Sequence, residues 1–285
     1  MKPAAFQYHA PKTLDEAVRV LGQVAPEDGR VLAGGQSLVP TMAFRMARPA
    51  HLVDINGIAE LDVLAASDAS LTIGASVRHA AFHKRVVEGP LGALLSDVVQ
   101  HIAHYPIRTR GTFCGSIAHA DPASEWCLAA VTLGATVTAR SIRGIRTLDA
   151  EDLFEGFMST SLAEDELLSE VRLPLLPLDT RFGFYEFSRR AGDYAIAMSL
   201  VTFRLVDGAM ADVRVGIGGA EGKPRRCADA EATLSGKVMS AQVFAEAGEA
   251  AAAAVDPMED AQTSAKYRRD LVRTVTRRAL ELAAA

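Results

Sequence analysis

Two glycine-rich segments, AGGQSL at residues 33–38 and GTFCGSIAHADP at residues 111–122, constrain this chain most. Both adjoin an apolar run and consist largely of small residues. Glycine has no Cβ and readily adopts positive φ, so backbone N–H groups in such segments can approach a ligand closely. Several N–H groups that converge on one point form an anion site without Lys or Arg. Two such segments in one domain therefore predict a site for the two phosphates of a dinucleotide.

The composition narrows the class of protein. The 285 residues suffice for one large domain or two ordinary ones. A net charge of −5 argues against a nucleic-acid surface, which needs a basic footprint. The sequence has no run of 18 apolar residues, and its opening MKPAAFQYHA lacks the apolar core of a signal peptide. We therefore expect no transmembrane segment, no nucleic-acid partner and a cytoplasmic protein.

The cysteine content limits the cofactors that this chain can hold. Cys114, Cys127 and Cys227 form neither a CxxC motif nor a metal-finger spacing. We expect reduced thiols, no metal site and no four-cysteine iron–sulfur cluster on this chain.

The pattern of the first 176 residues predicts short strands that alternate with helices. Thr13 is a predicted N-cap, with Glu16 at the capping-box position. A buried strand at 30–32 leads into the first glycine segment. Because the spacing there is not G-x-G-x-x-G, a Rossmann domain is disfavoured. Further predictions are strands at 51–55, 61–77 (as a pair), 135–139 and 167–173, and helices at 76–103 (ended by Pro106) and 126–133, with the second glycine segment as a turn.

A change of pattern follows the proline-punctuated stretch LPLLPLDT at residues 173–180. Long strands come next, and three helices follow at 229–234, 240–255 and 264–284. Strands followed by helices predict a separate α+β domain. The last helix carries several arginines, for which a solvated face is favoured over a membrane or partner surface.

Taken together, these motifs resemble the flavoprotein subunit of the molybdenum hydroxylases, the xanthine dehydrogenase and carbon monoxide dehydrogenase family, whose medium subunit binds FAD. The resemblance covers essentially the whole chain, and the paired glycine motifs are its most specific part. The other matching segments are F-x-Y-x-x-P-x-x-x-x-E-A at 6–17, LVDI at 52–55, IGA at 73–75, IR at 107–108, RRAGDYAIA at 189–197 and KYRR at 266–269.

The resemblance implies an α+β fold with two parts. The first is a two-lobed FAD-binding domain of the vanillyl-alcohol-oxidase (PCMH) type at residues 1–176, with lobes at about 1–56 and 57–176. The second, at residues 177–285, is a smaller C-terminal α+β domain like that of the carbon monoxide dehydrogenase flavoprotein, with an antiparallel sheet and helices.

The resemblance also implies how individual residues meet the FAD. The first segment would wrap the pyrophosphate from one side through Ala33, Gly34, Gly35, Gln36 and Ser37. The second would meet it from the other side through Gly111, Thr112, Gly115 and Ser116, with Phe113 and Cys114 lining the turn.

Other positions are expected along the length of the cofactor. Ile102 would lie near the adenosine end, and Glu125 near the adenine ribose. The backbone of Leu168 would approach the flavin ring, and Tyr194 would border the isoalloxazine. Asp121 would either order the second segment or reach cofactor hydroxyls.

The implied function is electron transfer by a non-covalent FAD subunit. A large molybdopterin-binding partner would hydroxylate the substrate, and a small partner would carry two [2Fe–2S] clusters. Electrons would pass from these clusters to the FAD and then to NAD⁺, a quinone or oxygen, commonly in a dimer of heterotrimers. No catalytic residue is assigned to this chain. The alternative is a self-contained FAD-dependent oxidase or reductase that acts on its own small organic substrate.

Some residues depart from the family pattern or admit two interpretations. Glu186 stands where many relatives have a flavin-proximal Lys, and Arg189 or Arg190 could supply that cation instead. Cys114 replaces a common Gly, which requires φ < 0. His119 is favoured as a turn residue beside the cofactor over a catalytic base, and Cys114 and Cys127 are favoured as buried thiols over redox groups.

Overall fold

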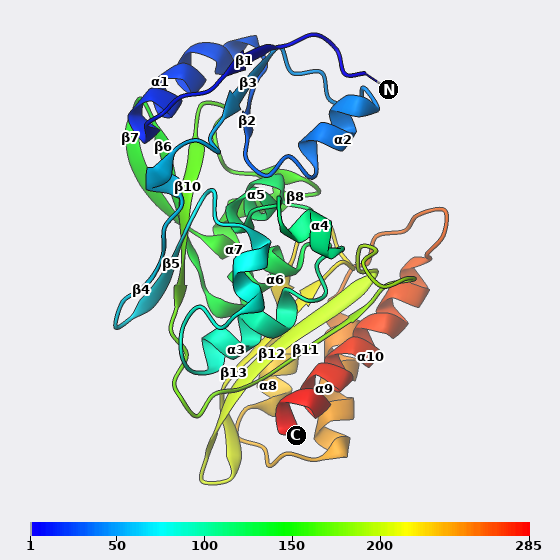
Figure 1. Ribbon diagram of the computed structural model, residues 1–285. Coiled ribbons are helices and arrows are strands. Elements are labelled where there is room, and N and C mark those ends of the chain that lie inside the picture. The colour runs from blue at the N-terminus through cyan, green and yellow to red at the C-terminus, as the bar shows by residue number, and fades with distance from the viewer. Residues whose placement is uncertain (1) are drawn as a thin grey trace.

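The computed structural model describes residues 2–285, and Figure 1 shows its sheets and the helices around them. The first sheet is parallel and has the strand order β1–β3–β2. Its elements are β1 (Gln7–His9), α1 (Leu14–Val24), η1 (Ala25–Glu27), β2 (Gly29–Leu32), α2 (Leu38–Ala43) and β3 (His51–Asp54). The predicted start of α1 is confirmed, since the Thr13 hydroxyl accepts a hydrogen bond from the Glu16 N–H at 3.2 Å.

The second sheet is antiparallel and has the strand order β4–β5–β10–β6–β7. Its strands are β4 (Leu64–Ala66), β5 (Ser70–Gly74), β6 (Thr136–Ser141), β7 (Gly144–Asp149) and β10 (Leu167–Pro174). Helices and one small hairpin occupy the connections: η2 (Ala59–Leu61), η3 (His79–His83), α3 (Pro90–Val98), α4 (Tyr105–Arg108), α5 (Phe113–His119), α6 (Glu125–Leu133), α7 (Ala150–Leu153), β8 (Phe154–Gly156) and β9 (Ser159–Thr160).

The third sheet is antiparallel in the order β11–β12–β13–β14, and three helices follow it in sequence. These elements are β11 (Arg181–Phe187), β12 (Ala197–Val206), β13 (Ala209–Gly218), β14 (Arg225–Arg226), α8 (Ala228–Leu234), α9 (Ala241–Ala254) and α10 (Ala265–Ala284). The predicted order of strands first and helices second is confirmed. The expected solvated arginine face of α10 is wrong for Arg268, which is buried and donates to the Ile196 and Gly219 carbonyls.

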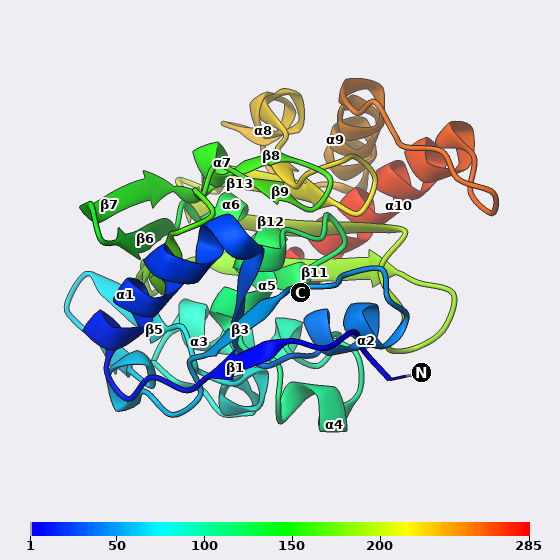
Figure 2. The same cartoon turned by 90° about the horizontal axis from the view of Figure 1, so that it is seen from above.

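The third sheet packs on both of its faces. Strands β11–β13 lie between α10 on one side and α3 and α6 on the other (Figure 1). Alternate residues of β12 accordingly join two cores, with Met198 and Leu200 in the first, and Val201 and Phe203 in the second. Figure 2 shows the same arrangement from above. The expected α+β fold is confirmed, and the expected boundary at residue 176 falls in the connection between β10 and β11.

The long helix expected over residues 76–103 is wrong. The structure has only the short η3 and the nine-residue α3 there, with a loop between them. Gly89 has φ of +85°, and Pro90 begins α3, so the chain turns at a point where the apolar pattern predicted an uninterrupted helix. Pro106 does not end a helix either, because it lies in the first turn of α4.

The second glycine segment is a helix and not the expected turn. Thr112 caps α5, and its hydroxyl accepts a hydrogen bond from the Gly115 N–H at 3.0 Å. A threonine followed by small residues satisfies the first turn of a helix even though glycine lowers helix propensity. Cys114 lies inside α5 and has no positive φ, as its replacement of a glycine requires.

Candidate cofactor site

A cavity of about 410 Å³ lies between the two glycine segments. The first segment leaves β2 along one wall, and α5 forms the facing wall. The loop after β9 contributes the third wall. The lining residues are Gly29, Arg30, Val31, Ala33, Gly34, Gly35, Gln36, Ser37, Leu38, His79, Gly111, Thr112, Gly115, Ser116, Ala118, His119, Thr160, Leu162, Ala163, Glu164 and Glu166. The cavity thus brings together nine of the predicted site residues, Ala33–Ser37 and Gly111, Thr112, Gly115 and Ser116.

The two glycine segments touch each other at positions where only glycine fits. A Cβ on Gly34 would lie 2.3 Å from the Arg110 carbonyl oxygen, and one on Gly111 would lie 2.5 Å from the His79 ring. Gly35 has φ of +71°, a conformation that strains any residue with a side chain. The close approach of the two backbones therefore depends on these glycines.

The backbone of the first segment has free donors. Within residues 2–285, the N–H groups of Gly34, Gly35, Gln36 and Ser37 donate to no protein acceptor. Backbone N–H groups are normally paired, so consecutive free donors beside a cavity need an external acceptor, which is water or a ligand. Neighbouring free N–H groups suit an anion, and the cavity that these residues line therefore fits the phosphates of a dinucleotide.

A hydrogen-bonded bracket joins the two segments from behind. The Asn56 amide donates to the Ala33 carbonyl at 2.8 Å and accepts from the Arg78 guanidinium at 2.6 Å. Arg78 also donates to the Arg110 carbonyl. Asp54 orients Asn56 by accepting from its backbone N–H at 2.8 Å. The distance between the two glycine segments is thus set by side chains outside the cavity.

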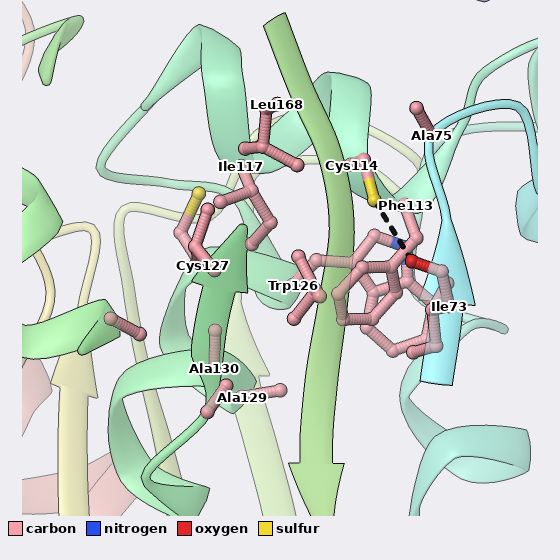
Figure 3. Packing of buried hydrophobic residues seen from close by; sticks show 14 of the residues in the cluster. Ile73, Ala75, Phe113, Cys114, Ile117, Trp126, Cys127, Ala129, Ala130 and Leu168 are labelled. Atoms are coloured by element: carbon pink, nitrogen blue, oxygen red, sulfur yellow. Dashed lines mark hydrogen bonds between the residues drawn. The ribbon is translucent and has the colours of Figure 1, made fainter. Parts of the chain in front are cut away.

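Phe113 and Cys114 do not line a turn as expected. Both side chains are buried in the first core, where Phe113 packs on Trp126 and the Cys114 thiol donates to the Ile73 carbonyl at 3.3 Å (Figure 3). Because α5 is helical, its residues diverge around the helix axis, so Gly115 and Ser116 face the cavity while Phe113 and Cys114 point into the core.

The thiols fit the expectation of buried cysteines. Cys114, Cys127 and Cys227 are all free and buried. Burial raises the pKa of each thiol above its ordinary value, which keeps it protonated.

Five further predicted residues lie outside the cavity lining, namely Tyr194 and four buried ones. The side chains of Ile102, Leu168 and Glu125 are buried. Asp121 is also buried, and its carboxylate accepts a hydrogen bond from the Ala123 N–H at 2.9 Å. This hydrogen bond orders the loop between α5 and α6, which is one of the two roles expected for Asp121, and a contact with cofactor hydroxyls stays a prediction.

Glu125 and Tyr194 share one end of the site. Tyr194 is 63% exposed, and its hydroxyl lies next to the Ser37 side chain. Loss of hydration, aided by the charges of Asp121 and Glu125, raises the pKa of Tyr194. The charge of Glu125 thus reaches Tyr194, although the resemblance assigns Glu125 to the adenine ribose and Tyr194 to the isoalloxazine, and these two assignments stay predictions.

Buried carboxyl groups gather at this end. Burial, aided by the charge of Glu186, raises the pKa of Glu125 to about 8. Glu186, whose side chain is 7% exposed, has one oxygen 3.6 Å from the His101 ring and the other without a hydrogen-bond partner. Arg189 and Arg190 are exposed and form no ion pair within residues 2–285. An acidic residue therefore occupies the position of the family lysine, close to the buried Glu125.

His79 is a cavity residue that the sequence did not reveal. It lies at the start of η3, in the stretch expected to be helical, and only the tertiary fold brings it to Gly111. No pattern in a single sequence marks it. His119, favoured as a turn residue beside the cofactor, does line the cavity at the end of α5.

Within residues 2–285, no cluster of three or more His, Cys, Asp or Glu side chains could hold a metal ion. In the same range, no helix is long and apolar enough to cross a membrane.

Comparison with known proteins agrees with this architecture. Residues 4–176 match the family described as the FAD binding domain in molybdopterin dehydrogenase, and residues 182–283 match the CO dehydrogenase flavoprotein C-terminal domain. The chain is 38% identical to the nicotine 6-hydroxylase medium subunit of Paenarthrobacter nicotinovorans over 284 residues, covering 98% of each chain. It is 33% identical to the carbon monoxide dehydrogenase medium chain of Hydrogenophaga pseudoflava, covering 99% and 98%.

Solved structures give the same result. The carbon monoxide dehydrogenase structure from Hydrogenophaga pseudoflava matches with a TM-score of 0.95 at 34% identity and covers 100% of this chain and 99% of that one. Quinoline 2-oxidoreductase from Pseudomonas putida 86 matches with a TM-score of 0.92 at 35% identity, covering 100% and 98%. The chain therefore belongs to the family of FAD-binding medium subunits of molybdenum-containing dehydrogenases and hydroxylases.

Proposed function

We propose that this chain holds FAD non-covalently in the cavity between its two glycine segments and transfers electrons between other chains and an external acceptor. The free N–H groups of Gly34–Ser37, which face the cavity opposite α5, carry this proposal. When bound, FAD supplies the redox chemistry, and the protein supplies binding, orientation and electrostatics.

The proposed contacts follow the cavity. The first segment (Ala33–Ser37) and the start of α5 (Thr112, Gly115, Ser116) hold the pyrophosphate, and Gly111 lets the two walls approach. Phe113 and Cys114 support α5 from the core. Ile102 and Leu168 support the site from behind its walls, because their side chains are buried.

The position of Tyr194 is the basis on which we assign the orientation of FAD in the cavity. We place the isoalloxazine at the end where the Tyr194 hydroxyl meets Ser37, and Glu125 and Asp121 then belong to the flavin end. The adenosine extends toward the third wall, where Glu164 lies. Glu125 would not contact the adenine ribose in this arrangement.

A comparison of FAD and FMN tests that direction. Glu125→Ala should weaken FAD and FMN by similar factors, because both contain the flavin and only FAD contains adenosine. Glu164→Ala provides the control at the opposite end and should affect FAD alone. A loss confined to FAD in the Glu125 variant would return Glu125 to the ribose.

The partners belong to the same proposal. Relatives of this chain are named medium subunits or medium chains, so this chain would join a large molybdopterin-binding subunit and a small subunit with two [2Fe–2S] clusters, in a dimer of heterotrimers. The three buried, separate thiols support placing the clusters on another chain. We propose a cytoplasmic location and NAD⁺, a quinone or oxygen as acceptor.

The test is the visible spectrum of the protein isolated from its own cell at native expression, with the flavin released by acid and identified. FAD bands with [2Fe–2S] absorption and two further chains are expected. FAD on this chain alone, fully reduced by a small organic substrate, would favour a self-contained oxidase or reductase instead. Absence of flavin would overturn the assignment of the cavity.

A further inference from the structure

We infer that His79 is a cofactor-binding residue, which donates a neutral N–H hydrogen bond to the pyrophosphate and is held in the required tautomer by Trp126. This inference rests on the proposed FAD site and adds a side-chain donor to a cradle otherwise built from backbone groups. His79 comes from neither glycine segment, yet it lines the same cavity.

Trp126 determines where the imidazole proton resides. The Trp126 indole N–H donates to His79 Nδ1 at 3.0 Å, and both side chains are buried. An indole N–H can only donate, so Nδ1 must be the unprotonated acceptor nitrogen. A neutral imidazole carries one proton, which must then be on Nε2. The core residue Trp126 thereby turns Nε2 into a donor.

The geometry directs this donor toward the glycine walls. The His79 backbone N–H donates to the Gly111 carbonyl at 3.0 Å, which fixes η3 against the second segment. A Cβ at Gly111 would come within 2.5 Å of Nε2, so only a glycine at this position leaves room beside the nitrogen. Within residues 2–285, Nε2 makes no hydrogen bond. A donor beside the cavity without a protein partner needs an external acceptor.

The surroundings keep the imidazole uncharged. Burial, followed by the positive charges of Arg78 and Arg108, lowers the pKa of His79 to about 3. A protonated ring would also have to donate from Nδ1, where the Trp126 N–H already points. His79 therefore contributes a directed hydrogen bond and no net charge, unlike the lysine or arginine of many phosphate sites.

A purely structural role is the competing explanation, because His79 also packs against Trp126 with ring centroids 6.3 Å apart. A structural histidine would stabilise the fold without sensing the cofactor. The two roles differ in what happens at Nε2 and at the phosphates when FAD binds, and NMR observes both directly in the wild-type chain.

The first measurement is ¹⁵N and ³¹P NMR of the purified chain, stripped of flavin and then titrated with FAD. The expected result is a neutral His79 protonated on Nε2 in both states, with an Nε2–H proton that moves downfield and exchanges more slowly when FAD binds. A proton on Nδ1, or an Nε2–H signal that does not change when FAD is added, would overturn the inference. This measurement uses the wild-type chain and therefore does not depend on the folding of any variant.

The second measurement is the FAD affinity of variants. His79→Phe keeps a ring against Trp126 but removes the donor, and it should weaken FAD by about 10-fold to 100-fold, as expected for a lost hydrogen bond to a charged group. His79→Gln restores an N–H donor and should recover part of the affinity. The matched control is His83→Phe in the same short helix, where His83 packs on Tyr105 and lies outside the cavity lining.

The outcomes separate the two hypotheses. If the wild-type chain binds no FAD, the proposed function fails. If it binds FAD while His79→Phe binds equally well and gives the same ³¹P spectrum, only the role of His79 fails. A Trp126→Phe protein that folds should show mixed His79 tautomers and weaker FAD binding.

Discussion

Glu125, Glu186 and Asp121 form an acidic group in the region where we place the flavin, with His101 and Arg108 as the nearby basic side chains. Burying charged carboxylates together is costly, and a buried carboxyl group commonly avoids this cost by keeping its proton. The raised pKa of Glu125, about 8, has this cause. The charge of Glu186 therefore helps to keep the Glu125 carboxyl group protonated.

The proton on Glu125 predicts how stability depends on pH. Unfolded Glu125 ionises near 4.5 and folded Glu125 near 8, so unfolding releases a proton in this window and the free energy of unfolding should fall as pH rises through it. Glu125→Gln should remove this slope, which is at most about 1.4 kcal/mol per pH unit. Urea unfolding of the flavin-free chain at several pH values measures it. Glu164→Gln, at an exposed position, is the control, and an unchanged slope in Glu125→Gln would contradict the assignment.

At the scale of elements, α5 is a short helix whose first turn faces the cofactor site. One side of α5 lines the cavity through Gly115 and Ser116. The other side packs into the core through Phe113, Cys114 and Ile117. The Thr112 cap fixes the first turn together with two further hydrogen bonds, from the Phe113 N–H to the Val77 carbonyl at 3.1 Å and from the Cys127 thiol to the Ser116 carbonyl at 3.4 Å.

Removing this cap should affect both stability and FAD binding. Thr112→Val keeps the shape of the side chain but loses the hydroxyl that accepts from Gly115, which should cost about 1 kcal/mol of stability. FAD affinity should fall as well, because the first turn loosens. Thr112→Ser retains the hydroxyl and should behave like the wild type in thermal unfolding and in FAD titration. Equal behaviour of the Val and Ser variants would rule out the cap.

The Asn56–Arg78 bracket offers a test of the link between the two glycine segments. Asn56→Ala and Arg78→Ala should each weaken FAD by about tenfold, because each breaks the connection between the Ala33 and Arg110 carbonyls. The double variant should lose little more than either single one, as residues in one network are not additive. FAD titration of the four proteins completes the cycle, and fully additive losses would show that the two residues act separately.

Local patterns in the sequence predicted local structure well. The Thr13 cap of α1 and the strand-then-helix order of the second half express short-range preferences, and the structure confirms them, whereas the second glycine segment is the helix α5 and not the expected turn. The helix expected over 76–103 failed because an apolar periodicity continued across Gly89 and Pro90. The charge effect of Glu125 on Tyr194, and the presence of His79 in the cavity, depend on the proximity of distant segments, which no local pattern encodes.

At the scale of the whole molecule, the cavity is assembled from segments that lie far apart in the sequence. The first sheet supplies one wall and α5 the opposite one, and the loop that leads to β10 supplies the third. That loop is fixed by paired hydrogen bonds of 2.7 Å between Arg146 and Glu166. The packed layers of β11–β13 and α8–α10 supply no residue to the lining.

FAD should therefore protect the molecule unevenly. A ligand that binds only the folded state stabilises it by about 2.7 kcal/mol at a concentration 100 times its Kd. Hydrogen exchange measured by mass spectrometry should show the largest FAD-dependent protection at residues 33–38, 111–119 and 160–166. Peptides from α9 and α10 serve as internal controls and should change little. Uniform protection across the chain would indicate that FAD stabilises the fold as a whole and has no preferred site.

The walls of the cavity also determine when the site first exists during synthesis. Their residues extend from Gly29 to Glu166, and Arg146 and Glu166, which fix the last wall, belong to the end of that interval. A ribosome that has released only the first sheet and α5 has produced two walls of the three. If the cavity holds FAD, loading should consequently wait until the chain has passed β10, and the proposed flavin contact at Tyr194 forms later still, so a nascent chain arrested before β10 should emerge colourless even when flavin is abundant.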